Sequence, residues 1–158
     1  MKLPDYRQES DWKKMGLEVS RQMLNYWGLK SNEYYFKPMF ELLKQKLLTS
    51  PILHADETYY TVLESETVKT YYWVFLSGKH DPYKITLYHH DPSRSEKVAL
   101  NFLGDYPGYL HCDMWQAYEQ LPKATLVGCW AHVRRKFHEA VPQTASEKEL
   151  TTAIACFT

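Results

Sequence analysis

The sequence is poor in cysteine and has no long hydrophobic run. Its three cysteines, Cys112, Cys129 and Cys156, are odd in number and far apart, which indicates reduced thiols rather than a disulfide framework. No apolar stretch approaches the ~20 residues that a transmembrane helix needs, and the polar N-terminus does not have the pattern of a signal peptide. We therefore expect a soluble, cytoplasmic protein without membrane contact.

The sequence also has no excess of positive or negative charge. Nineteen basic and nineteen acidic residues give a net charge of zero, which argues against a strongly basic nucleic-acid-binding protein but leaves room for a local basic surface. Hydrophobic residues make up 44% of the chain and aromatic residues 15%, enough for a sizeable core. A length of 158 residues fits one domain with a small appendage.

The first part of the chain, residues 1–49, has the pattern of helices. A break at Gly16 precedes a polar helix start at Ser20, Arg21 and Gln22. This is the outline of a helix-turn-helix, whose second helix enters the major groove and would contact DNA through these three residues. A plain helical hairpin is an equal alternative. The expected helices are residues 8–15, 19–27 and 39–48, with residues 28–38 as a connector.

The second part, residues 50–158, has the pattern of an α/β domain. Three consecutive strands with short links suggest an antiparallel meander, and alternating helices and strands follow. A capping box at residues 93–96 is expected to open the first of these helices. The expected order is β-β-β-α-β-α-β-α, over residues 52–63, 71–76, 84–89, 93–103, 109–113, 114–120, 124–128 and 130–140, with a last helix over 146–158.

Two aspartates, Asp56 and Asp113, interrupt or end strand-like apolar runs and lie 57 residues apart. A carboxylate at the end of a central strand costs desolvation free energy unless a cap, a cation or a metal compensates it. Side by side in one sheet, the two would form a site for a divalent metal ion. Each has a simpler alternative, because Asp56 could cap a turn and Asp113 could cap the following helix.

Three segments in fixed order resemble transposases of the insertion-sequence sixty-six family: residues 54–58 (HADET), 103–118 (LGDYPGYLHCDMWQAY) and 128–137 (GCWAHVRRKF). The resemblance implies a ribonuclease H-like mixed sheet in which the first and fourth strands are neighbours. It also implies metal-dependent DNA cleavage and strand transfer, with Asp56 and Asp113 as catalytic ligands of Mg²⁺ or Mn²⁺. The implied partners are terminal-repeat DNA, target DNA and further copies of the protein.

The sequence also departs from this family pattern. The third acidic residue of the family, a glutamate, lies far downstream, and the cysteine-rich finger at the family's N-terminus is absent. We therefore expect a truncated transposase core that is inactive by itself. One alternative is a DNA-binding remnant without metal chemistry. Another is a small nuclease that uses Asp56, Asp113 and Glu139.

Several residues near these motifs have two readings. A basic cluster could hold DNA phosphate or form a solvated helix face; it consists of Arg134, Arg135 and Lys136. Cys129 and His132 lack the two further partners of a closed zinc site, so a packed cysteine and a hydrogen-bonded histidine are expected. Glu57 is expected to be solvated or to support the site from behind. Arg94 matches an arginine of the family but has no assigned role.

Overall fold

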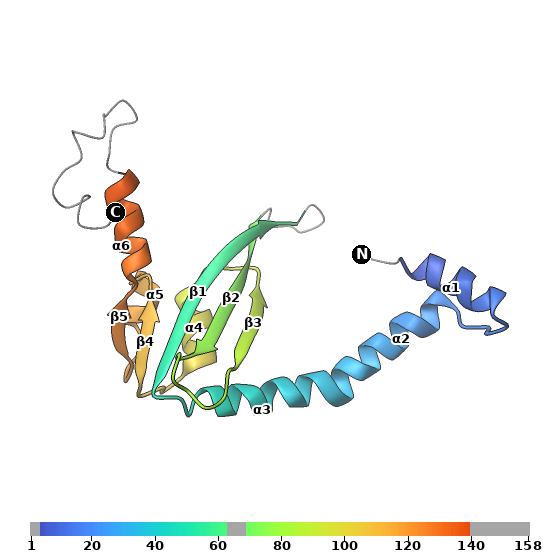
Figure 1. The fold of residues 1–158 in the computed structure, drawn as a ribbon, viewed down its shortest axis with the longest axis horizontal. Coiled ribbons are helices and arrows are strands. Elements are labelled where there is room, and N and C mark those ends of the chain that lie inside the picture. The colour runs from blue at the N-terminus through green and yellow to red at the C-terminus, as the bar shows by residue number, and fades with distance from the viewer. Residues whose placement is uncertain (1–3, 63–68, 140–158) are drawn as a thin grey trace. The chain divides into compact units, whose positions relative to one another are not determined.

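The computed structural model describes residues 4–62 and 69–139, drawn in colour in Figure 1. The chain divides into two compact units, Met1–Gln45 and Lys46–Thr158. None of the helices in the described part of the chain has the length and apolar character needed to cross a membrane. The helix expected over residues 146–158, and Cys156 within it, lie outside the described residues.

The N-terminal unit is built from two helical segments. Helix α1, Asp5–Lys14, ends before Gly16, whose φ of 81° is in the left-handed region that glycine adopts without strain. Helix α2, Arg21–Ser31, begins after Ser20, whose hydroxyl accepts a 3.2 Å hydrogen bond from the backbone N–H of Met23. The predicted break at Gly16 is therefore confirmed, whereas the helix expected from residue 19 begins at Arg21, after the Ser20 cap.

The predicted connector at residues 28–38 is wrong. Helix α2 passes through a π-helical turn, η1 (Asn32–Phe36), directly into helix α3 (Lys37–Leu47), as the ribbon shows (Figure 1). Pro38 lacks the N–H that an α-helix needs for its i→i−4 bond, which would normally break the helix. In the turn just before it, the N–H of Lys37 bonds to Asn32, and this wider turn accommodates the proline.

The C-terminal unit contains a five-stranded mixed sheet in the order β3-β2-β1-β4-β5. The first three strands form the predicted antiparallel meander. Strand β4 pairs in parallel with both β1 and β5, so the first and fourth strands are neighbours, as expected. The strands are β1 (Ile52–Thr61), β2 (Lys69–Ser77), β3 (Thr86–Asp91), β4 (Tyr109–Cys112) and β5 (Thr125–Gly128).

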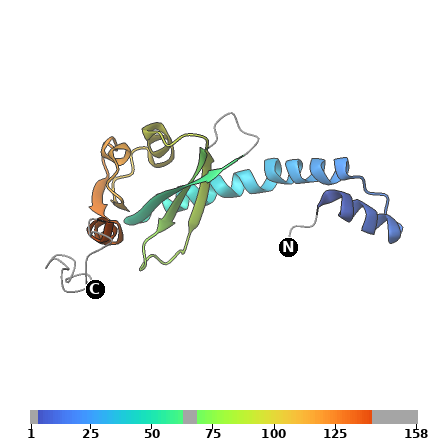
Figure 2. The ribbon, with the colours of Figure 1, turned by 90° about the horizontal axis from the view of Figure 1, so that it is seen from above.

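Among the described residues that follow β1, this unit has three helices in the predicted order: α4 (Glu96–Leu103), α5 (Gln116–Glu119) and α6 (Trp130–Glu139). Figure 2 shows α4 and α5 on one side of the sheet and α6 on the other. The predicted capping box is wrong by two residues. Ser93 bonds to Asp91 instead, through both its N–H and its hydroxyl at 2.8 Å, so α4 begins only after Ser95.

The core lies between the sheet and helices α4 and α5. Alternate residues of the strands point into it, as the pleat of a β-strand requires. The rings of Phe75 on β2 and Phe102 on α4 stack with centroids 3.8 Å apart. The fully buried side chains include Leu47, Leu53, Trp73, Phe75, Leu103, Leu110, Cys112 and Tyr118.

Candidate active site

A hollow opens where the neighbouring strands β1 and β4 separate. Their pairing ends at His54 and His111, while β1 continues to Thr61 and the chain turns away after Cys112 through Met114, which has a φ of 62°. We call this space the β1–β4 hollow; its volume is ≈ 340 Å³. Its lining residues are Asp56, Glu57, Tyr59, Tyr71, Arg94, Asp113, His132, Arg135, Lys136 and Glu139.

Both predicted aspartates line the β1–β4 hollow. Asp56 is exposed, and its Oδ1 accepts a hydrogen bond of 3.0 Å from the N–H of Glu57. Asp113 is half-buried, and its Oδ1 accepts a 3.0 Å bond from the N–H of Trp115, which stabilises the turn before α5. One oxygen of each carboxylate, Oδ1, therefore bonds to a nearby backbone N–H, and the second oxygen, Oδ2, has no such backbone bond within the described residues.

Of the two expectations for Glu57, solvation is wrong because its side chain is buried, and the supporting role beside the site remains. Its side chain is 1% exposed, because the pleat directs it to the face of the sheet that α5 covers. The Nε and Nη2 groups of Arg94 both donate to its Oε1, the first at 2.7 Å, and the hydroxyl of Tyr118 donates to Oε2 at 2.9 Å. Burial raises the pKa of Glu57, and these hydrogen bonds oppose the rise only in part.

Arg94 connects the buried carboxylate to the hollow. Its guanidinium carbon lies 4.3 Å from the centroid of the Trp115 ring, within cation–π distance. Its Nη2 also lies 3.5 Å from Oδ2 of Asp113, and 39% of the side chain is exposed. The loop that carries Arg94 is thereby fastened to β1 and to the segment after β4.

Helix α6 brings basic side chains to the same hollow. Of the predicted basic cluster, Arg135 and Lys136 line it and Arg134 does not. Glu139 also lines it and pairs with Lys136 at 3.1 Å. Within residues 4–62 and 69–139, however, no group of three or more His, Cys, Asp or Glu side chains is placed to hold a metal ion. Glu139 therefore does not assemble with the two aspartates as the nuclease alternative requires.

A histidine pair lies beside Asp56, in an adjoining hollow of ≈ 250 Å³ that Cys129 and His132 also line. The Nδ1 atoms of His54 and His111 are 3.0 Å apart. Burial and the neighbouring His111 lower the pKa of His54. Nδ1 of His132 is buried without a hydrogen-bond partner in the described structure. The prediction that His132 is hydrogen-bonded is therefore wrong for this atom. Cys129 is half-buried.

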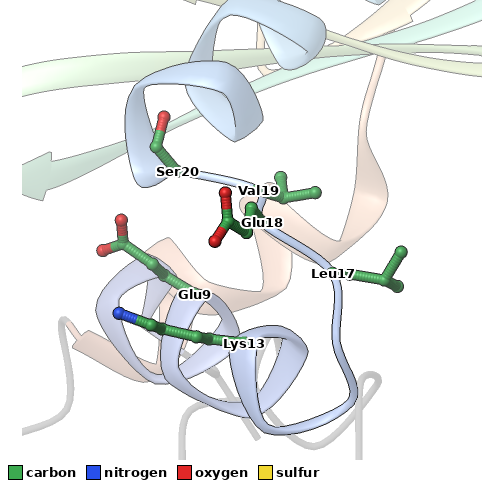
Figure 3. A pocket seen from close by; sticks show the side chains of 6 residues that line it. All are labelled: Glu9, Lys13, Leu17, Glu18, Val19 and Ser20. Atoms are coloured by element: carbon green, nitrogen blue, oxygen red, sulfur yellow. The ribbon is translucent and has the colours of Figure 1, made fainter.

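The N-terminal unit has a hollow of its own, of ≈ 380 Å³, beside the turn between α1 and α2. Figure 3 shows its residues, Glu9, Lys13, Leu17, Glu18, Val19 and Ser20. Two carboxylates face one ammonium group there, which disfavours binding of an anion such as DNA phosphate. Arg21 and Gln22 are exposed at the start of α2 and do not line this hollow.

Comparison with known families matches residues 1–156 to the family described as "Transposase IS66 family". The chain belongs to this family. Two similar proteins come from Sinorhizobium fredii (strain NBRC 101917 / NGR234), the uncharacterized proteins y4qI and y4jD. They are 27% identical over 171 residues and 28% identical over 164 residues.

These alignments cover 97% and 94% of the IS66-family chain but 31% and 32% of the two relatives. The chain thus spans about a third of the length of the curated relatives it matches. No solved structure matches it.

Sequence reasoning on this IS66-family chain missed the linked set of Glu57, Arg94 and Tyr118. One signal for it is available, because a glutamate directly after an exposed strand residue must point to the opposite, covered face. A buried carboxylate then requires a cationic or hydrogen-bonding partner. The identity of that partner is not contained in the local pattern, since Arg94 and Tyr118 lie 37 and 61 residues from Glu57.

Proposed function

We propose that this chain forms the two-aspartate part of a ribonuclease H-like core that cleaves and transfers DNA strands during transposition. The observation that supports it most directly is that Asp56 and Asp113 line one hollow, beside two parallel neighbouring strands. Ligand sites commonly lie at the carboxyl ends of such strands. Membership of the IS66 family makes DNA the expected substrate.

The two carboxylates fit a divalent metal ion in their donor chemistry. Mg²⁺ takes oxygen ligands and is commonly held by one or two carboxylates, with water and substrate phosphate completing the shell. Oδ2 of Asp56 has no hydrogen-bond partner among the described residues, and Oδ2 of Asp113 has only the 3.5 Å contact with Arg94. Bound Mg²⁺ or Mn²⁺ would polarise the phosphate and activate the attacking oxygen.

Two groups of residues would bind the DNA. Arg135 and Lys136 line the hollow from α6 and would neutralise phosphates close to the two aspartates. Arg134 would contact the backbone from the exposed surface of the same helix. Arg21 and Gln22 begin α2 directly after its cap residue Ser20, and their exposed side chains would contact terminal-repeat DNA. Target DNA and further copies of the protein would complete the assembly.

The metal site is tested by titrating Mn²⁺ into the 158-residue chain and following the free ion by electron paramagnetic resonance. We expect Asp56→Asn and Asp113→Asn each to weaken binding at least about tenfold, because each removes a charged ligand. Asp105→Asn is the matched control, since Asp105 is exposed and paired with Lys123 outside the hollow. Equal Mn²⁺ affinity in all four proteins would reject the proposal.

A cleavage assay separates the transposase core from a small nuclease. Because no group of three or more His, Cys, Asp or Glu side chains is placed to hold a metal ion within residues 4–62 and 69–139, we propose that this chain with Mg²⁺ neither nicks nor joins DNA alone. The two-metal mechanism needs further ligands to hold both ions. Metal-dependent nicking that is lost in Glu139→Gln would favour the small nuclease instead, since Glu139 lines the same hollow.

A further inference from the structure

Arg94 is held rigidly before any ligand arrives. Two of its nitrogens donate to Oε1 of the buried Glu57, and its guanidinium stacks over Trp115. Tyr118 holds the other oxygen of Glu57. An arginine fixed in this way loses little side-chain entropy when it binds a further partner, so more of the interaction energy is available for binding.

The guanidinium still has unused donors. Its bonds to Glu57 and its contact with Asp113 involve Nε and Nη2. Nη1, with two N–H groups, has no hydrogen-bond partner within residues 4–62 and 69–139. Arg94 lines the β1–β4 hollow and 39% of its side chain is exposed, so the side chain is partly accessible to a ligand there.

The chemistry of the hollow selects an anion as that ligand. Arg135 and Lys136 line the hollow with Arg94, and a guanidinium binds phosphate oxygens with paired, charge-assisted hydrogen bonds. The carboxylates of Asp56 and Asp113 would repel an anion in the absence of a cation. Binding of phosphate here is therefore expected to be strongest when a divalent ion is present.

We propose that Arg94 binds a phosphate group of DNA in the β1–β4 hollow, and that Glu57, Tyr118 and Trp115 are the residues that position it. The inference rests on the proposed DNA-processing function, which assigns no role to Arg94. Its structural alternative is that Arg94 serves only to neutralise the buried Glu57. The two differ in a measurable way, because only a phosphate contact affects the salt dependence of DNA binding.

The test measures binding of a short fluorescein-labelled DNA duplex to the 158-residue chain by anisotropy, with Mg²⁺ and at several salt concentrations. In the double variant Arg94→Met/Glu57→Gln, both members of the buried pair are removed, so no unpaired charge remains in the core. Arg94→Lys keeps a cation beside Glu57 but lacks the planar fork. The matched control, Lys123→Met/Asp105→Asn, removes an exposed ion pair outside the hollow.

We expect the double variant to bind about tenfold more weakly and to lose about 0.9 from the slope of log K against log salt, the value for one phosphate. Arg94→Lys should keep the slope and bind about threefold more weakly, and the control should match wild type. Unchanged affinity and slope in a folded double variant, or wild-type affinity in Arg94→Lys, would overturn the inference.

Undetectable binding of the duplex by the wild-type chain would also overturn the Arg94 inference, because a prearranged phosphate site should give measurable binding in this assay. Thermal melting monitored by circular dichroism establishes that each variant is folded. The Mn²⁺ titration of Asp56→Asn and Asp113→Asn contains no DNA. Failure of the Arg94 inference and failure of the proposed metal site are therefore read from separate experiments.

Discussion

The hydroxyl of Tyr118 donates a 2.9 Å hydrogen bond to Oε2 of Glu57, 61 residues earlier in the chain. Tyr118 is fully buried and the Glu57 side chain is 1% exposed. The bond therefore joins α5 to β1 inside the core. Burial and the negative charge of Glu57 raise the pKa of Tyr118, so its hydroxyl remains a donor throughout the physiological pH range.

Tyr118→Phe should lower the free energy of unfolding by about 1.5–3 kcal/mol, the usual contribution of a hydrogen bond to a charged group. The ring remains, so the loss reports the bond rather than a cavity. Urea unfolding of the purified chain measures it. Tyr88→Phe is the control, because Tyr88 is 64% exposed and its change should stay within about 0.5 kcal/mol. Equal stability of the two variants would argue against a stabilising bond.

Tyr106 should make the fold sensitive to alkaline pH. Burial and the charge of Asp81 raise the pKa of Tyr106 to about 12, whereas an unfolded tyrosine titrates near about 10. The folded state thus holds this proton more tightly. Its contribution to stability is complete below pH about 10 and is lost as pH rises through about 12.

Tyr106→Phe removes the hydrogen bond from the hydroxyl to the carbonyl of Ser50, 2.8 Å long. The variant should therefore be less stable by about 1 kcal/mol near neutral pH. Its disadvantage relative to wild type should shrink between pH about 10 and about 12, because it has no proton to lose there. Denaturant unfolding across this range checks the prediction, and a constant difference would contradict it.

Gly104 should not tolerate a side chain. It follows α4 with φ 54° and ψ −126°, a combination that other residues adopt only with strain. An added Cβ would meet no atom within 4 Å, so any cost of Gly104→Ala comes from the backbone alone. We expect a loss of about 1–3 kcal/mol in the free energy of unfolding.

The matched control for Gly104→Ala is Gly28→Ala, inside α2, where an added Cβ also meets no atom within 4 Å. In a helix interior, alanine is favoured over glycine by roughly 0.5–1 kcal/mol. This variant should therefore gain helix stability, measured by circular dichroism on heating. Destabilisation by both substitutions would mean that lost space, and not backbone conformation, controls the result.

Arg21→Ala should weaken binding to terminal-repeat DNA and reduce the salt slope by about 0.9, because one phosphate contact is lost. The basis is the exposure of Arg21 in the first turn of α2, directly after the Ser20 cap. Lys14→Ala is the control, since Lys14 already pairs with Asp11 at 3.1 Å. An unchanged slope in Arg21→Ala would exclude this helix start from the DNA interface.

Much of the sheet could be predicted from the sequence, because apolar and polar residues alternate along a strand. The order of strands and helices in the C-terminal unit, and the meander of its first three strands, follow from this alternation and from the short links between strands. The meeting of Asp56 and Asp113 at one hollow was expected only through the family resemblance, since the pairing of distant strands is not encoded locally.

The sequence-based predictions were wrong where a side chain bonds to a partner other than the expected one, or where a helix continues past residues that usually end it. Gly28 and Pro38 are usual helix breakers, yet a π-helical turn carries the helix through this region. Ser93 resembled a helix cap but bonds to Asp91. For Glu57, a solvated and a supporting role both stayed open, because its partners, Arg94 and Tyr118, come from remote segments.

The adjacent acids Asp56 and Glu57 have opposite environments, and the pairing of β1 with β2 maintains this from Leu53 to Thr61. The parity of a residue's position along β1 therefore decides which acid remains exposed and which enters the core. Insertion of one residue between Pro51 and Asp56 would move Asp56 into the position of Glu57 and Glu57 to the exposed face. The shorter aspartate would then lie opposite Arg94 and Tyr118, which bond to Glu57 in the native register. A one-residue shift in the register of β1 would therefore lose the hydrogen bonds of Glu57 with Arg94 and Tyr118. This loss disfavours the shifted register relative to the native one.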